Sequence, residues 1–170
     1  MLSIQFSTST AFTSGIIRRL CHSEFSHVDI VTPEGLLGVS GSDHTINDIG
    51  GVQIRPSGMW PYLNPPKVAR LATAGADAII DVAKTQIGKP FDNDALYNFL
   101  EDMGHTKKRD WRDHGAWFCS EFVAWALETC DFFPYTLVAA KNRITPADLL
   151  LLLNPFMTEE NIKEFGYVTT

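Results

Sequence analysis

Two residues of this sequence, Cys119 and His27, have the side chains that nucleophilic catalysis requires. Cys119 lies in AWFCSEFVAWAL, where the apolar spacing predicts a helix over residues 116–130. The thiol would then lie in the first turn, where unpaired backbone N–H groups and the helix dipole favour the thiolate. The same N–H groups can hold the oxyanion that forms when a thiolate attacks a carbonyl. Such a nucleophile needs a base within hydrogen-bond reach.

His27 is the base that the pattern favours. It lies in SHVDIV, within a strand expected over residues 25–31. Alternation places His27 and Asp29 on one face of this strand and Val28 and Ile30 on the other, so the imidazole can face a cleft. His114, which is close to Cys119 in the sequence, is the best alternative base.

A structural interpretation of Cys119 competes with the catalytic one. Apolar side chains recur along its helix at the spacing of a single buried face, and a cysteine in such a stripe is usually a small core residue. The stripe consists of Cys119, Phe122, Val123, Ala126, Leu127 and Cys130. For Cys21 and Cys130, the other two cysteines, the core interpretation is strongly favoured.

The remaining pattern predicts one α+β domain. A small helix precedes most of the strands and the other helices follow, which is an α+β layout. Strands are expected over residues 1–6, 25–31, 36–40, 52–55 and 68–73, and helices over residues 11–21, 76–87, 93–103, 116–130 and 146–153. The domain spans residues 1–170, with residues 155–170 as a C-terminal extension.

Composition excludes several classes of function. The chain has 14 Lys and Arg against 20 Asp and Glu, a net charge of −6, so nucleic-acid binding is not expected. The odd number of cysteines without framework spacing argues against a disulfide scaffold. No metal-ligand motif and no cofactor motif is present. The longest apolar stretch near the C-terminus, residues 147–153, is too short to span a bilayer. No signal peptide is visible, so synthesis in the cytoplasm with free thiols is expected.

Several short motifs, taken in order, resemble the circularly permuted NlpC/P60 hydrolases. These are the YiiX-like and lecithin:retinol acyltransferase-like branch of the papain superfamily. The matching blocks are IIRR at residues 16–19, SHVDIV at 26–31, GKPFD at 88–92, WFCSEFV at 117–123 and RITPADL at 143–149. In this branch the histidine strand precedes the cysteine helix, as His27 precedes Cys119 here. SHV followed by GGVQIRP at 50–56 is also similar to bacteriophage hydrolases.

The resemblance implies a permuted papain-like fold, with an antiparallel sheet packed against the helix that carries the cysteine. It implies a cysteine peptidase or amidase that cleaves an amide through a thioester, with a peptidoglycan stem peptide as substrate. A phage context would make the chain a wall-degrading or tail-associated protein, with tail proteins as partners. Two alternatives stay open: an acyl-ester hydrolase or acyltransferase, and a non-catalytic structural or binding virion protein that keeps the fold.

The third catalytic position is less well defined by the sequence. The family places a polar residue on the strand after the histidine strand, where it orients the imidazole. If residues 32–35 form a hairpin turn, Ser40 falls opposite His27, and Asp43 and His44 follow as alternatives. Asp29 shares the face of His27 but lies about 6.5 Å along the strand, which is an awkward position for orienting the ring.

Overall fold

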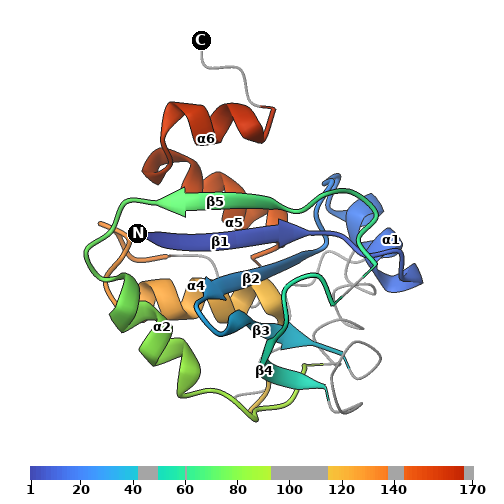
Figure 1. The fold of residues 1–170 in the computed structure, drawn as a ribbon, viewed down its shortest axis with the longest axis horizontal. Coiled ribbons are helices and arrows are strands. Elements are labelled where there is room, and N and C mark those ends of the chain that lie inside the picture. The colour runs from blue at the N-terminus through green and yellow to red at the C-terminus, as the bar shows by residue number, and fades with distance from the viewer. Residues whose placement is uncertain (42–49, 60, 93–114, 138–143, 167–170) are drawn as a thin grey trace.

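The computed structural model describes residues 1–41, 50–59, 61–92, 115–137 and 144–166 (Figure 1). Within these ranges the protein is α+β, with one antiparallel sheet in the strand order β4-β3-β2-β1-β5. The strands are β1 Leu2–Ser7, β2 His27–Thr32, β3 Gly35–Ser40, β4 Gly51–Arg55 and β5 Lys67–Leu71. The helices are α1 Phe12–Leu20, α2 Ala76–Lys84, α4 Cys119–Thr129, α5 Pro146–Leu153 and α6 Glu159–Glu164, with a 3-10 turn at Asn154–Phe156.

The hydrophobic core lies between the sheet and the helices. Alternate residues of the strands, such as Ile4 and Phe6 on β1 and Val28 and Ile30 on β2, are fully buried. Helix α4 packs against β2 and β3, and α2 packs against α4 (Figure 1). Burying each large apolar side chain contributes about 1.5–3 kcal/mol. The expected packing of an antiparallel sheet against the helix that carries Cys119 is therefore confirmed.

Helix α4 begins at Cys119 and not at residue 116 as predicted. The residues before it are extended and pair with the segment that follows α2. The Trp117 N–H donates to the Pro90 carbonyl at 3.0 Å, and the Asp92 N–H donates to the Trp117 carbonyl at 3.0 Å. This pairing places Cys119 itself at the first helical position. The predicted helix over residues 93–103 lies outside the described residues.

The other predicted strands and helices are confirmed with small shifts at their ends. The helix expected over 76–87 ends at Lys84. The C-terminal residues pack against the edge strand β5: the Arg70 N–H donates to the Asn161 Oδ1 at 2.7 Å, and the Asn161 amide donates to the Val68 carbonyl at 2.8 Å. No helix of the described ranges has the length and apolar character needed to cross a bilayer.

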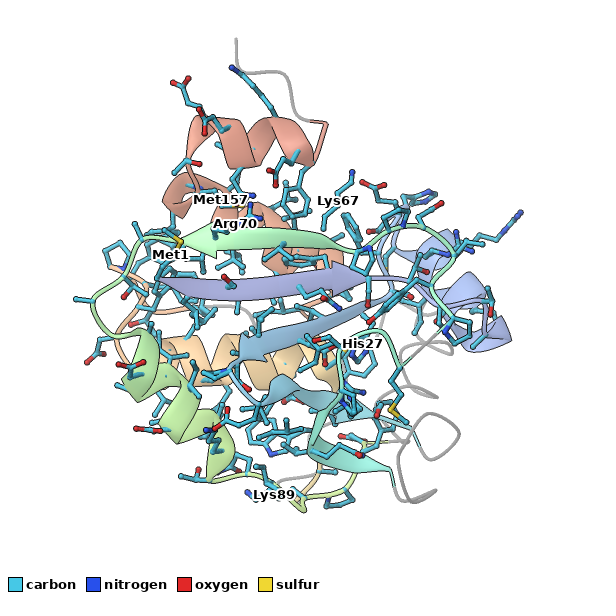
Figure 2. The ribbon with its side chains drawn as sticks, in the orientation of Figure 1. Met1, His27, Lys67, Arg70, Lys89 and Met157 are labelled. Carbon is cyan, nitrogen blue, oxygen red and sulfur yellow. The ribbon has the colours of Figure 1, made fainter. Side chains whose placement is uncertain are left out.

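The face of the sheet opposite the core carries a set of polar residues. Ser7 pairs with His27 and Gln5 pairs with Asp29 across β1 and β2. On the other side of β2, Gly38 of β3 pairs with Gln53 of β4. Paired residues share a face, so the alternation of β2 directs His27 and Asp29 away from the core. Figure 2 shows His27 at the start of β2.

Candidate active site

His27 and Asp29 contact each other directly. The His27 Nε2 lies 3.0 Å from the Asp29 Oδ1. Asp29 reaches the ring in spite of its awkward position along the strand, because the Cα separation overstates the distance between side-chain tips that lean toward each other. The imidazole partner in this structure is therefore Asp29 on the same strand and not Ser40.

Arg55, from β4, holds the carboxylate of Asp29. Its Nη2 donates to the Asp29 Oδ1 and also lies 3.4 Å from the His27 Nε2. Asp29 is 0% exposed and Arg55 is 2% exposed, so this ion pair is withdrawn from water. Burying an ion this deeply costs several kcal/mol of desolvation free energy unless the ion is paired. Arg55 was not predicted as a site residue, although a lone arginine in the GGVQIRP block was a usable signal.

Gly38 provides the space in which this pair forms. A Cβ at this position would lie 1.9 Å from the Asp29 Oδ1 and 3.2 Å from the Arg55 Nη2. Strand β3 therefore needs a glycine at the point where the Asp29 carboxylate and the Arg55 guanidinium meet. The requirement for glycine here is steric, because a Cβ would clash with the carboxylate, and the φ of Gly38 lies outside the left-handed region.

Gly38→Ala should disrupt the site from a position that carries no functional group. The new methyl group must displace the Asp29 carboxylate, and we expect a loss of roughly 3 kcal/mol in the free energy of unfolding, which urea titration measures. Gly15→Ala is the matched control, because a Cβ there meets nothing within 4 Å and alanine favours the helix. Equal stability of the two variants would contradict the contact.

Cys119 and His27 are brought together. The Cys119 thiol lies close enough to the imidazole to contribute to the raised pKa of His27. Cys119 occupies the first position of α4 after the N-cap Phe118, and Cys119 is 2% exposed. The N–H groups of the first helical turn have no intrahelical acceptor, so they face outward from the helix start beside the sulfur. Glu121 accepts a hydrogen bond from the Phe118 N–H at 3.4 Å, which caps the N-terminus of α4.

Sequence blocks that are far apart in the chain meet to position Cys119. The Val52 N–H donates to the Lys89 carbonyl and the Gly88 N–H donates to the Val52 carbonyl, both at 2.9 Å. Gly51 makes this possible: its φ is +129° and a Cβ there would lie 2.3 Å from the Lys89 carbonyl oxygen. The GGVQIRP, GKPFD and WFCSEFV blocks therefore form one continuous backbone network, which links β4 to the start of α4.

The electrostatics of the site favour an imidazolium. Burial lowers the pKa of His27, but the charge of Asp29 and its hydrogen bond, together with those of Cys119, raise the pKa to about 9. Burial raises the pKa of Asp29, but the charges of His27 and Arg55 outweigh it and hold the pKa below its usual value. At neutral pH the structure therefore favours a charged ring beside the thiol, between an ionised carboxylate and the helix start.

The other two thiols are in different surroundings. Burial and then the charge of Asp148 raise the pKa of Cys21 to about 11. Burial, with a contribution from Asp131, also raises the pKa of Cys130. Neither has an imidazole among the causes of its shift. Both thiols should stay protonated at neutral pH, which makes them poor nucleophiles.

The remaining predicted site residues are placed as follows. Ser40 ends β3, and continuing the β2–β3 register places it opposite His27, but its buried Oγ makes no hydrogen bond within the described ranges. Asp43, His44 and His114 lie outside those ranges. Among the described side chains there is no group of three or more His, Cys, Asp or Glu suited to a metal ion.

A scan against models of protein families and a search of curated proteins found no match to this chain.

Proposed function

We propose that this protein is a cysteine hydrolase of the permuted papain-like type, with Cys119 as nucleophile and His27 as its acid–base partner. The observation that carries the proposal is the contact of His27 with the buried Asp29 carboxylate, beside a thiol at the N-terminus of α4. Asp29 is the third member, in place of Ser40, because its carboxylate contacts the His27 ring at Nε2. Arg55 acts as a positioning residue through Asp29.

The raised pKa of His27 favours a thiolate–imidazolium pair that exists before the substrate is attacked. The alternative is a neutral imidazole that removes the thiol proton during the attack. The Nε2 atom of the ring is directed at the Asp29 carboxylate. Asp29 stabilises the imidazolium and fixes the ring orientation, which is the role of the carboxylate in a catalytic triad. The thiolate gains further stability from the helix dipole at the start of α4.

The reaction then follows in two halves. The Cys119 thiolate attacks the amide carbonyl, an S–C bond forms, and the oxyanion is held by the Cys119 N–H. His27 gives its proton to the leaving nitrogen as the C–N bond breaks, which leaves a thioester. The neutral imidazole next takes a proton from water, the resulting hydroxide attacks the thioester, and the thiolate departs with the imidazolium restored.

The first substrate to test is a peptidoglycan stem peptide, on the basis of the resemblance to NlpC/P60 and bacteriophage hydrolases. The experiment incubates purified protein with soluble stem-peptide fragments and, in parallel, with acyl esters, and mass spectrometry follows the products. A new amine terminus from the peptides supports the proposal. Ester cleavage alone would assign the acyl-ester alternative, and no cleavage of either substrate class would count against hydrolysis.

One observation favours a non-catalytic protein that keeps the fold. Cys119 is only 2% exposed and belongs to the hydrophobic core cluster with Phe122 and Val123. A carbonyl has to reach the sulfur through a narrow opening for the hydrolase to work. The buried arrangement of Arg55, Asp29 and His27 favours the catalytic interpretation. Burying three charged groups costs desolvation free energy, and apolar side chains could fill a purely structural site without that cost.

A further inference from the structure

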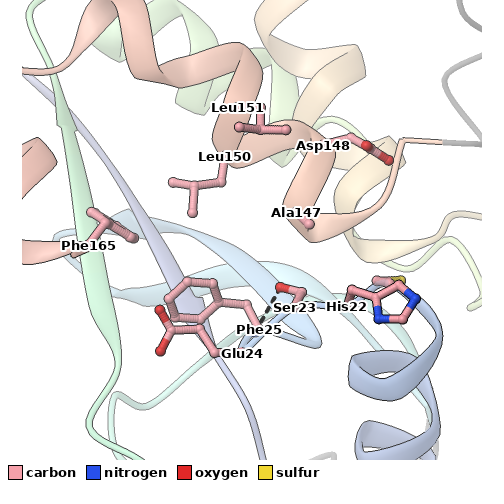
Figure 3. A pocket seen from close by; sticks show the side chains of 10 residues that line it. His22, Ser23, Glu24, Phe25, Ala147, Asp148, Leu150, Leu151 and Phe165 are labelled. Atoms are coloured by element: carbon pink, nitrogen blue, oxygen red, sulfur yellow. Dashed lines mark hydrogen bonds between the residues drawn. The ribbon is translucent and has the colours of Figure 1, made fainter. Parts of the chain in front are cut away.

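A pocket with a volume of about 400 Å³ lies between the segment that joins α1 to β2 and the first turns of α5 (Figure 3). Among the described residues, its lining includes neither Cys119 nor His27, and it does not include Ser40. The pocket is therefore separate from the candidate catalytic pair. The polar side chains beside His27 lie instead on the neighbouring strands of the sheet.

Two serine hydroxyls flank His27 on these strands. Ser7 of β1 pairs directly with His27, and continuing the β2–β3 register places Ser40 of β3 opposite His27 on the other side. The Cβ atoms of opposed residues lie about 4.5–5.5 Å apart, so both hydroxyls are near the ring. Ser7 is 1% exposed and Ser40 is 4% exposed, and neither Oγ has a hydrogen-bond partner within the described ranges. A buried hydroxyl of this kind is a binding place for a small polar molecule.

Ser40 is linked to the start of α4 by a short series of backbone contacts. Ser40 pairs with Gly51 at the start of β4, and the Lys89 carbonyl lies against Gly51. Trp117, just before α4, donates to the Pro90 carbonyl at 3.0 Å. Because Gly51 has no side chain, β4 places none beside the Ser40 hydroxyl at this register position. Ser40 is therefore the one of the two serines that lies toward the segment leading into α4.

The second half of the proposed reaction needs a water molecule beside the imidazole. His27 must remove a proton from this water as its oxygen attacks the thioester carbon. Asp29 already contacts the ring at Nε2, so Ser40 is not required to orient the imidazole. The His27 side chain is 12% exposed, which gives solvent a route to this end of β2. A serine hydroxyl beside the ring has the lone pairs needed to accept a hydrogen bond from such a water.

We propose, on the basis of the proposed hydrolase function, that the Ser40 hydroxyl binds the water molecule that hydrolyses the thioester. The water donates one hydrogen bond to the Ser40 Oγ and one to the imidazole, which leaves an oxygen lone pair for the thioester carbon. His27 takes the proton from the water, the O–C bond forms, and the S–C bond breaks. The Cys119 thiolate and the imidazolium are restored, and the acyl group leaves as a carboxylic acid.

The test uses p-nitrophenyl acetate with the full-length protein, because this ester separates the two halves of the reaction. Acetylation of the thiol releases p-nitrophenolate in a burst, and the steady rate then reports hydrolysis of the acetyl thioester. Peptide mass mapping locates the acetyl group on Cys119. Ser40→Ala should leave the burst rate unchanged and slow the steady rate roughly tenfold, the loss of one hydrogen bond to the water. Acetylated protein should accumulate as a result.

Ser7→Ala is the matched control. Both serines are buried, lack a hydrogen-bond partner in the described part of the chain and lie opposite His27, but Ser7 is on β1, on the far side of the ring from β3. Its replacement should change neither phase, and both variants should unfold in urea close to the wild type. Hydroxylamine attacks a thioester without a bound water, so it should release the acetyl group equally fast from the wild type and from Ser40→Ala.

The outcomes separate the two proposals. If Cys119 is acetylated but Ser40→Ala hydrolyses the thioester at the wild-type rate, or Ser7→Ala slows it equally, the water assignment is overturned and the hydrolase stands. Loss of the burst in Ser40→Ala would also overturn the assignment, because the hydroxyl would then act before the thioester exists. If the wild type never acetylates Cys119, the hydrolase fails and the water assignment fails with it.

Discussion

Cys119→Ala should abolish amide hydrolysis, lowering kcat by at least about 10⁴-fold, because no thioester can form without the sulfur. The stability of the fold should change little, by about 1 kcal/mol, since alanine is close in size to the buried thiol. Hydrolysis of the best stem-peptide substrate measures the first effect, and urea unfolding measures the second. Together the two readouts separate loss of the nucleophile from loss of the fold.

Cys130→Ala is the matched control for this prediction. Cys130 follows the other end of the same helix, and burial raises the pKa of its thiol, so it has no place in the reaction. Its replacement should leave kcat unchanged. Full activity in Cys119→Ala, with Cys130 intact or not, would show that the hydrolysis belongs to another residue or to a contaminant.

Asp29→Asn should damage both stability and activity. Arg55 would be left as a buried charge without its partner, which costs about 3–5 kcal/mol in the free energy of unfolding. The largest influence that raises the pKa of His27 would also be lost, so burial would return the ring to its neutral form. We expect kcat to fall by about 10³- to 10⁴-fold, and NMR titration of the ring to show a lower pKa.

The double variant Asp29→Asn with Arg55→Met distinguishes the two effects. Removing both charges takes away the unpaired ion, so unfolding in urea should return toward the wild-type free energy. The hydrolysis rate should stay low, because no carboxylate is left to stabilise the imidazolium. Activity that returns together with stability would mean that Asp29 and Arg55 only support the fold.

Much of the fold could be predicted from local pattern. The strands alternate apolar and polar residues with period two, and the run from 25 to 31 is a clear example that became β2. The start of α4 was placed too early because residues 116–118 fit a helical apolar pattern. Their extended conformation depends on hydrogen bonds to Pro90 and Asp92, which only tertiary structure brings within reach.

The candidate site was predicted in part. Cys119 and His27 could be found because each sits at a place where local structure favours its chemistry, a helix start and a polar strand face. The identity of the imidazole partner depends on three strands at once: Asp29 on β2, the space above Gly38 on β3, and Arg55 on β4. No spacing along the chain encodes that arrangement. The register places Ser40 near the ring, as expected from the sequence, but the carboxylate that contacts the ring is that of Asp29.

The most direct measurement is the rate at which iodoacetamide alkylates Cys119 at about pH 6.5, in the wild type and in His27→Ala. The pKa of His27 is raised to about 9, so the ring is charged at this pH, and the proposed mechanism places a thiolate beside it. Without the ring, the sulfur loses the cation beside it, and alkylation should slow by about 10- to 100-fold. Equal rates in the two proteins, as slow as those of Cys21 and Cys130, would contradict an imidazole that ionises this thiol.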